Sequence, residues 1–233
     1  MRVAGAGRMD DVAEAQWTAV IAVKRLSAAK SRLRGAVADE WHQELALAMV
    51  LDTVTAVLRA DRIARLLVVT DDPEAAAAVA RLGAEAVPDR PDAGLNAAFR
   101  YGADVVAGLS GPRAVLTGDL PALTGADLDD ALRAAAGRSF VADAAGPGTV
   151  LLAAPAGRPL DPRFGVGSAA AHASSGARAL TGEWPGLRQD VDTAADLQEV
   201  LALGAGRHTC ALLRDLGLTA DCGSAPMRVG SAR

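Results

Sequence analysis

The sequence predicts an α/β fold, in which helices cover both faces of a mostly parallel β-sheet. Short runs rich in β-branched residues alternate along the chain with longer runs of helical periodicity, and strands that alternate with helices form such sheets. The 233 residues are 51% apolar, which is enough material for one large hydrophobic core. We therefore expect a single domain over residues 17–218, an N-terminal arm over 1–16 and a disordered tail over 219–233.

The first half of the chain contains alternating strand and helix signals. Asp39 is a candidate N-cap for a helix over 39–59, where apolar residues recur at three- and four-residue spacing. Pro73 and Gly83 bracket an Ala-rich helix, the usual pairing of proline at a helix start with glycine at its end. Short apolar runs predict buried strands at residues 17–23, 66–70 and 84–87.

The rest of the chain continues this alternation at first, and then two predicted strands follow one another without a helix between them. A helix over 95–109 precedes an apolar strand at 114–117, and Thr124, with Asp127 three residues later, is expected to cap the next helix. After the end of that helix, near residue 136, we expect strands at 139–142 and 149–154, a helix at 169–180, an extended segment at 187–191 and helices at 193–203 and 209–216.

Charge and composition exclude several classes of protein. The net charge of −4 argues against a nucleic-acid-binding protein, because no net positive field gathers backbone phosphates. The sequence contains no stretch long and apolar enough to span a membrane, and we expect no signal peptide because its first residues include acids and lack an apolar run. The two cysteines, Cys210 and Cys222, lack further ligands at zinc spacing, so we expect free thiols rather than a disulfide. Together these features favour a cytoplasmic protein.

A basic loop follows the first predicted strand, at the end of a strand where parallel sheets bind ligands. It reads AVKRLSAAKSRL and contains the only lysines of the chain, Lys24 and Lys30. Neither glycine-rich phosphate-binding signature is present there. With Arg25, Arg32 and Arg34, the loop gathers five cations, which suit the charges of a triphosphate. A solvated basic loop is the alternative.

Three aspartates follow later strands. Asp119 stands in VLTGDLPAL, and Asp190 and Asp192 stand in RQDVDT, where an extended backbone would project both carboxylates from one face. Like charges held together are costly unless a cation compensates them, and Mg²⁺ prefers oxygen ligands. We therefore expect these three carboxylates to form a Mg²⁺ site; turn-capping and helix-capping roles are the alternatives.

A glycine-rich segment, DPRFGVGSAAAH, is a candidate anion site. Gly165 and Gly167 frame a loop and Ser168 begins the next helix, whose exposed N–H groups would attract a carboxylate or phosphate. One turn further on, His172 is expected to be structural rather than catalytic. Asn96 is the only asparagine of the chain, and both helix capping and recognition of a base or ribose are open for it.

Six motifs occur in the order seen in one enzyme family. They are AVKRLSAAKSRL, GLNAAF, GDLPAL, GTVLL, PRFGVGSAAAH and DVDTAADL, and they lie within residues 17–205. In this order they resemble the phosphoenolpyruvate and 2-phospho-L-lactate guanylyltransferases of coenzyme F-420 biosynthesis (FbiD/CofC-like). The resemblance implies a three-layer nucleotidyltransferase-type fold, Rossmann-like and related to the molybdenum-cofactor guanylyltransferases (MobA-like). Their glycine-rich first loop is absent from the family and from this chain.

The resemblance also implies a role for each candidate residue. Contacts to the phosphorylated three-carbon acid would come from Thr149, Gly165 and Ser168, and the three aspartates would bind Mg²⁺. The basic loop would hold the GTP phosphates, with catalytic cations at Lys24, Lys30 and Arg32. The nucleotide contacts implied are Ala22, Lys24, Lys30, Gly94 and Asn96.

The implied reaction joins GTP and phosphoenolpyruvate into enolpyruvyl-diphospho-guanosine and releases pyrophosphate. An oxygen of the acceptor phosphate attacks the α-phosphorus in line, so positioning and charge neutralisation carry the rate. The alternative acceptor is 2-phospho-L-lactate; phosphoenolpyruvate is preferred by analogy with bacteria of GC-rich genomes.

Other functions stay open at this point. One is another nucleotidyltransferase that acts on a sugar phosphate or a pterin cofactor, and a more remote one is a non-catalytic nucleotide-binding module. The sequence leaves open whether the protein is a monomer or a homodimer, and whether its product is handed over to the next pathway enzyme. We expect neither a nucleic acid nor a membrane among its partners.

Overall fold

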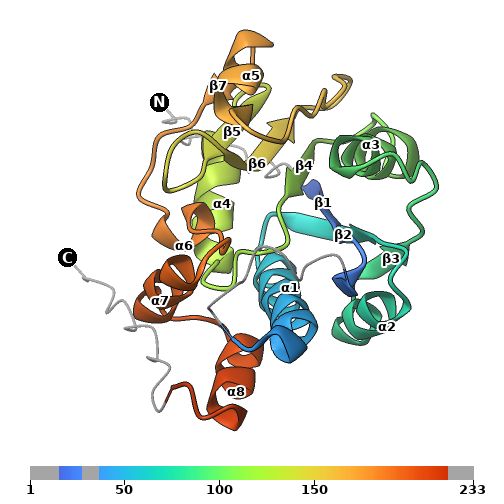
Figure 1. Ribbon diagram of the computed structural model, residues 1–233. Helices are drawn as coiled ribbons and strands as arrows, with labels where there is room; N and C mark the ends of the chain where they lie inside the picture. The colour runs from blue at the N-terminus through green and yellow to red at the C-terminus, as the bar shows by residue number, and fades with distance from the viewer. Residues whose placement is uncertain (1–15, 28–36, 220–233) are drawn as a thin grey trace, which may run out of the picture.

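A seven-stranded sheet forms the centre of the described part of the chain, in the order β3-β2-β1-β4-β6-β5-β7 (Figure 1). The structure is a computed structural model that describes residues 16–27 and 37–219. The strands are β1 (Trp17–Ala22), β2 (Ile63–Val69), β3 (Glu85–Val87), β4 (Arg113–Leu116), β5 (Ser139–Ala142), β6 (Thr149–Ala154) and β7 (Arg178–Ala179). The first six lie at or near the positions that the sequence predicts.

Strand β6 runs against its neighbours in this otherwise parallel sheet. β1 pairs in parallel with β2 and β4, β2 with β3, and β5 with β7, whereas β6 is antiparallel to both β4 and β5. In this register Leu116, at the end of β4, lies opposite Leu151, near the start of β6. The start of β6 therefore lies at the same edge as the carboxyl ends of β1, β4 and β5.

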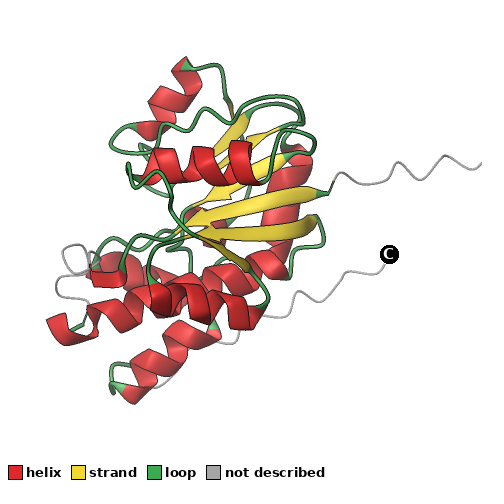
Figure 2. Cartoon of the chain, turned by 90° about the vertical axis from the view of Figure 1, so that its right-hand side faces the viewer, coloured by secondary structure: helices red, strands yellow, loops and turns green. Residues whose placement is uncertain are grey.

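Helices cover both faces of the sheet and give the molecule three layers (Figure 2). The helical elements are η2 (Asp39–Trp41), α1 (His42–Leu58), α2 (Pro73–Leu82), α3 (Leu95–Arg100), η3 (Tyr101–Val106), α4 (Gly125–Ala134), α5 (Ser168–Ser174), α6 (Pro185–Arg188), α7 (Ala194–Leu203) and α8 (Arg207–Asp215). Ile21 and Leu116 pack against α1, α2, α4 and α6 on one face. Val20 and Phe140 pack against α3, η3 and the chain before α5 on the other. The predicted α/β architecture is confirmed.

A third apolar cluster joins the C-terminal helices to α1. Leu45 and Met49 of α1 pack with Leu197 and Val200 of α7 and with Leu213 of α8. Since the opposite side of α1 packs on the sheet, this helix is buried on two sides and links the sheet to the C-terminal part of the described chain.

A buried carboxylate on α1 caps α8. Asp52 accepts hydrogen bonds from the backbone N–H groups of His208 (2.9 Å) and Thr209 (2.8 Å), in the first turn of α8. A Cβ on Gly206 would lie 2.3 Å from the Cγ of Asp52, so glycine is needed at this approach. Burial raises the pKa of Asp52, against the lowering effect of these N–H donors.

Asp52→Ala is expected to lower the free energy of unfolding by about 2 kcal/mol, because the variant loses a helix cap made of two charge-assisted hydrogen bonds. Urea unfolding followed by circular dichroism measures the change. The control is Glu199→Ala, which removes an exposed carboxylate from α7 and is expected to stay within about 0.5 kcal/mol of the parent. Equal losses for the two variants would contradict the capping role.

Two predicted helices are shorter in the structure. The helix expected over 95–109 is α-helical only to Arg100 and then widens into the π-helical η3. The carboxylate of Asp104 in η3 lies 3.5 Å from the buried guanidinium of Arg113 and accepts from the N–H of Leu160, contacts that sequence periodicity does not reveal. The helix expected over 169–180 ends at Ser174, because Gly176 turns the chain with a φ of +86°.

Two further expectations are wrong in detail. The segment expected to be extended at 187–191 begins as helix α6, since Pro185 occupies its first turn. Asp39 is not an N-cap: it is the first residue of η2, and its predecessor Ala38 provides no side-chain cap. By contrast, Thr124 caps α4 by accepting from the N–H of Asp127 (3.1 Å), as predicted.

Cys210 is disulfide-bonded, so the expectation of a free thiol is wrong for this residue. Thiols usually stay reduced in the cytoplasm, but this general rule does not show which sulfur atoms the fold brings close together. Cys222 is outside the described residues, as are nearly all of the expected arm and tail. Within the described ranges, no helix has the length and apolar character needed to cross a membrane.

Candidate active site

The turn after β4 places Asp119 at the carboxyl edge of the sheet. The fully buried Thr53 of α1 accepts a hydrogen bond from the N–H of Leu120 (3.0 Å), and its hydroxyl lies 3.2 Å from the carbonyl oxygen of Gly118. The same hydroxyl lies closer to the carbonyl oxygen of Met49 (2.9 Å), so this one side chain connects α1 to both neighbours of Asp119. A Cβ on Gly118 would lie 3.3 Å from Ile21, so the glycine lets this turn pass close to β1.

The loop between α6 and α7 brings Asp190 to the same edge. The N–H of Val191 donates to the carbonyl oxygen of Asp119 (3.2 Å). Helix α6 lies so close to the chain after Asp119 that a Cβ on Gly186 would be 2.1 Å from the carbonyl oxygen of Ala122. The two predicted aspartate motifs are therefore joined through backbone contacts.

The carboxylates at this edge share one electrostatic environment. Burial, and then the negative charges of Asp119, Asp192 and Asp143, raise the pKa of Asp190 to about 7. A set of oxygen donors with crowded like charges suits Mg²⁺, which takes few protein carboxylates. Among the described residues, however, no group of three or more His, Cys, Asp or Glu side chains has the arrangement of a metal site. Mg²⁺ at these carboxylates stays a prediction.

Asp143 is a member of this cluster that our sequence analysis missed. It follows β5 directly and accepts from the N–H groups of Gly146 and Gly148 in the hairpin that leads to β6. A signal was available, because an aspartate directly after a predicted strand lies where parallel sheets bind ligands.

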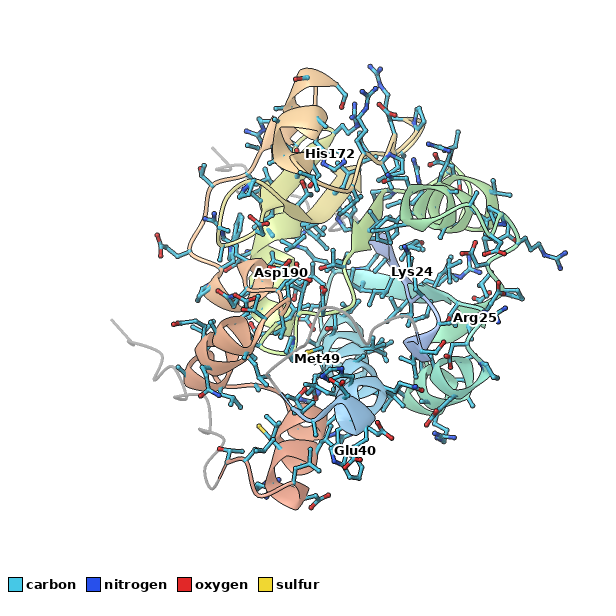
Figure 3. The ribbon with its side chains drawn as sticks, in the orientation of Figure 1. Lys24, Arg25, Glu40, Met49, His172 and Asp190 are labelled. Atoms are coloured by element: carbon cyan, nitrogen blue, oxygen red, sulfur yellow. The ribbon has the colours of Figure 1, made fainter. Side chains whose placement is uncertain are left out.

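The chain after β1 begins the predicted triphosphate loop. Lys24 is exposed just beyond β1 (Figure 3). Two residues later the N–H of Leu26 donates to the Oδ2 of Asp72 (2.9 Å), whose Oδ1 caps α2. Burial acts to raise the pKa of Asp72, but the N–H donors and the positive charge of Arg25 outweigh it, and the pKa is lowered. The predicted phosphate contacts Lys30 and Arg32 lie outside the described residues.

The other predicted nucleotide contacts lie near the same edge. Ala22 is the last residue of β1, and Gly94 precedes α3 with a φ of +88°. Asn96 does not cap α3: its Oδ1 accepts from the N–H of Phe164 (2.7 Å) and its Nδ2 donates to the carbonyl oxygen of the same residue (2.9 Å). Asn96 thus ties α3 to the loop before Ser168, and a contact to the nucleotide stays a prediction.

The predicted acceptor residues lie around the start of β6. Thr149 is its first residue, and its Oγ1 lies 3.0 Å from the Nδ1 of the fully buried His172. Ser168 opens α5 with 2% exposure, and Gly165 before it has a φ of +135°. The structure thus brings the acceptor motifs together.

The helix-start anion site does not have the expected form. Helix α5 is only seven residues long. The N–H of Ser168 donates to the carbonyl oxygen of Gly165 (3.1 Å), and that of Ala169 donates to the carbonyl oxygen of Pro147 (3.0 Å). These two N–H groups are bonded within the protein and therefore do not provide the expected anion site.

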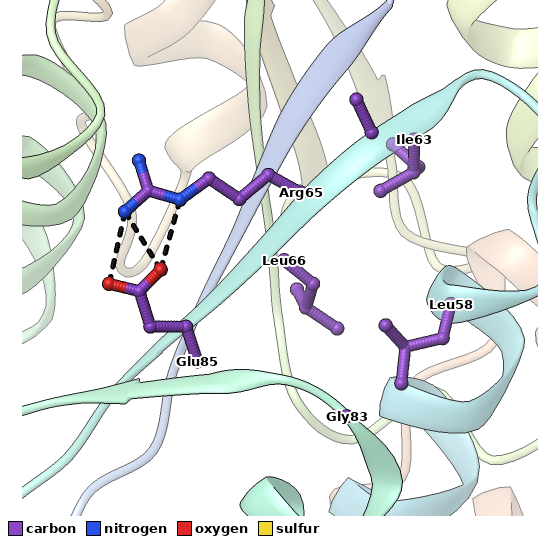
Figure 4. Close-up of a pocket in the computed structure, with 7 residues that line it drawn as sticks. Leu58, Ile63, Arg65, Leu66, Gly83 and Glu85 are labelled. Carbon is purple, nitrogen blue, oxygen red and sulfur yellow. Dashed lines mark hydrogen bonds and ion pairs between the residues drawn. The ribbon is translucent and has the colours of Figure 1, made fainter.

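Two cavities lie away from this edge. One, of about 200 Å³, adjoins the ion pair between Arg65 and Glu85 (2.8 Å) beside the first residues of β2 (Figure 4). The other, of about 840 Å³, has Arg138 and Pro155 in its wall, before β5 and after β6. Both therefore adjoin the opposite ends of the strands and are not part of the candidate site.

Comparison with known families matches residues 17–231 to the family described as "Guanylyl transferase CofC like". The chain belongs to this family. The resemblance carried by the six motifs is thereby confirmed. The matched residues include both Asp119 and Asp190.

Named relatives of this CofC-like chain cover most of its length. The phosphoenolpyruvate guanylyltransferase of Salinispora arenicola is 58% identical over 200 residues, which are 84% of this chain and 92% of the relative. The phosphoenolpyruvate guanylyltransferase of Geodermatophilus obscurus is 52% identical over 209 residues, which are 87% of this chain and 96% of the relative.

Solved structures confirm the fold class. A nucleotidyl transferase from Methanothermobacter superposes with a TM-score of 0.61 at 22% identity, covering 79% of this chain and 95% of the other. A cytidylyltransferase from Leptospira borgpetersenii gives a TM-score of 0.53 at 12% identity, covering 87% and 95%. At these identities the likeness shows the nucleotidyltransferase-type three-layer fold alone.

Proposed function

We propose that this CofC-like protein transfers the guanylyl group of GTP to phosphoenolpyruvate, with Mg²⁺, and releases pyrophosphate. One observation carries the proposal. In the strand order β1-β4-β6, Lys24 follows β1, Asp119 follows β4 and Thr149 begins β6, all at one edge. Neighbouring strands lie about 4.8 Å apart. The carboxylate of Asp119 therefore lies between the cation of Lys24 and the hydroxyl of Thr149 that would bind the acceptor. The names of the relatives support the choice of acceptor.

This order suits an in-line displacement at the α-phosphorus. The acceptor phosphate is already ionised and needs no general base. Thr149 and Ser168 donate hydrogen bonds to the acceptor, and Lys24 offsets charge on the leaving pyrophosphate. Asp119, Asp190 and Asp192 would hold Mg²⁺, which when bound supplies compensation for the phosphate charges. The chain's own contribution is to orient the two substrates.

The test is a mass measurement of the product after the protein is incubated with GTP, Mg²⁺ and one acceptor at a time. The mass of enolpyruvyl-diphospho-guanosine, with stoichiometric pyrophosphate, is expected with phosphoenolpyruvate. If product forms only with 2-phospho-L-lactate, the protein is a guanylyltransferase with that compound as its acceptor. No pyrophosphate with either acceptor would overturn the proposal.

Lys24→Ala is expected to raise the KM for GTP about tenfold or more, because one charge-assisted contact contributes roughly 1.5–3 kcal/mol. The KM for phosphoenolpyruvate should change little. Steady-state kinetics with each substrate varied measures both constants. Arg133→Ala, which removes an exposed cation from α4, is the control. If both variants have the same KM for GTP, Lys24 does not contact the triphosphate.

A further inference from the structure

His172 links the acceptor residues in a chain of hydrogen bonds. Its Nε2 lies 2.8 Å from the backbone nitrogen of Arg163, and its Nδ1 lies 3.0 Å from the Oγ1 of Thr149. The ring also packs edge-on against Phe164, with centroids 5.1 Å apart. Phe164 is in turn held by Asn96 of α3. The proposed reaction assigns no role to this histidine.

The hydrogen bonds determine which ring nitrogen carries the proton. A backbone N–H can only donate, so the Nε2 that faces the N–H of Arg163 must be an unprotonated acceptor. The proton of the neutral ring is therefore on Nδ1, and it points to the Oγ1 of Thr149. Thr149 accepts this hydrogen bond, which leaves its own hydroxyl proton to be donated elsewhere.

The ring is kept neutral by its surroundings. Burial, and then the positive charge of Arg138, lower the pKa of His172 to about 4; Arg163 acts in the same direction, and Asp161 acts against them. At neutral pH, Nε2 thus remains available to the N–H of Arg163.

We propose that His172 is a positioning residue for the acceptor: by donating from Nδ1 to Thr149, it makes the Thr149 hydroxyl a hydrogen-bond donor to an anionic oxygen of the acceptor. This inference rests on the proposed function, since it takes Thr149 to contact the phosphorylated three-carbon acid. A hydroxyl that already accepts one hydrogen bond and is free to donate matches a phosphate or carboxylate oxygen, which only accepts. The same ring fixes Arg163 and Phe164, and so the loop that leads to Ser168.

Two substitutions separate the bonds of the ring. His172→Gln places an amide near the Nε2 position, where its oxygen can accept from Arg163, but it removes the donor to Thr149. His172→Asn places an amide nitrogen near the Nδ1 position and keeps that donor. We expect His172→Gln to raise the KM for phosphoenolpyruvate about tenfold and to change the KM for GTP less than twofold. His172→Asn, which keeps the donor to Thr149, is expected to raise the KM for phosphoenolpyruvate less than His172→Gln does.

A double-mutant cycle with Thr149→Val tests whether His172 acts through Thr149. In the Thr149→Val background, His172→Gln is expected to cause less than a twofold further rise in the KM for phosphoenolpyruvate. A merely structural histidine would instead lower stability, give equal changes in both KM values and give additive effects. Either additivity or an unchanged KM for phosphoenolpyruvate would overturn the inference.

The tautomer can be measured without turnover. Long-range ¹H–¹⁵N correlation spectra of ¹⁵N-histidine-labelled protein are expected to show His172 protonated on Nδ1 and unprotonated on Nε2. Protonation on Nε2 would overturn the inference even if both variants fail to fold. If the parent protein forms no product with phosphoenolpyruvate, the proposed function fails, whereas normal turnover with unaltered His172→Gln kinetics refutes only the role of His172.

Discussion

Asp190→Asn is expected to reduce Mg²⁺-dependent turnover at least about a hundredfold and to leave the fold intact. Removing one carboxylate deletes a proposed cation ligand, and losses of this size are typical when one electrostatic partner of a developing charge is removed. The same change relieves the crowding that raises the pKa of Asp190 to about 7. Without Mg²⁺, the unfolding midpoint should therefore equal or exceed that of the parent.

The informative readout is the shift of the unfolding midpoint on addition of Mg²⁺, because it does not depend on catalysis. The parent should be stabilised by Mg²⁺ and Asp190→Asn should not. Glu199→Gln, which neutralises an exposed carboxylate on α7, should keep both activity and the Mg²⁺ shift. A folded Asp190→Asn protein with parental turnover would eliminate the metal assignment.

Gly186→Ala is expected to lower the free energy of unfolding by about 3 kcal/mol or more. The added Cβ would lie 2.1 Å from the carbonyl oxygen of Ala122 and 2.8 Å from its carbonyl carbon. Both atoms belong to the backbone, so no flexible side chain can move aside, and overpacking against a fixed neighbour is costly. Helix α6 would have to move away from the turn that carries Asp119.

Denaturant unfolding measures this loss, and Gly111→Ala provides the matched control. A Cβ at Gly111 has nothing within 4 Å and its φ is not positive, so this variant should unfold like the parent. In any residual folded Gly186→Ala protein, turnover should fall as well, because α6 leads directly to Asp190. A midpoint equal to that of Gly111→Ala would show that α6 does not pack as the structure has it.

The sequence predicts the order of the central elements because their signals are local. Alternation of apolar runs places β1 to β6, and Pro73 with Gly83 brackets α2 almost to the residue. The two-residue β7 and the four-residue α6 carry too little periodicity to be recognised. Their formation depends on tertiary contacts, such as the bond from the N–H of Arg178 to the carbonyl oxygen of Arg138.

The candidate site is predictable to the same extent. Asp119 could be chosen because it lies in the turn after a predicted strand, and the same rule would have found Asp143. The residues that hold the site could not be chosen in this way. Thr53 lies 67 positions before Leu120, whose N–H donates to it, and nothing local in sequence pairs Asn96 with Phe164 or His172 with Thr149. Such pairings arise only when distant segments pack together.

The reversal of β6 has a consequence for how acceptor preference can change. Because β6 starts at the carboxyl edge, β5, its hairpin and β6 form one contiguous stretch, residues 139–154, that delivers both Asp143 and Thr149 to the site. The loop to Ser168 follows soon after, whereas Lys24 and Asp119 come before this stretch in the sequence. Exchanging residues 138–168 between relatives is therefore expected to change the acceptor while Lys24, Asp119, Asp190 and Asp192 stay in place, and the KM for GTP of such chimaeras should equal that of the parent.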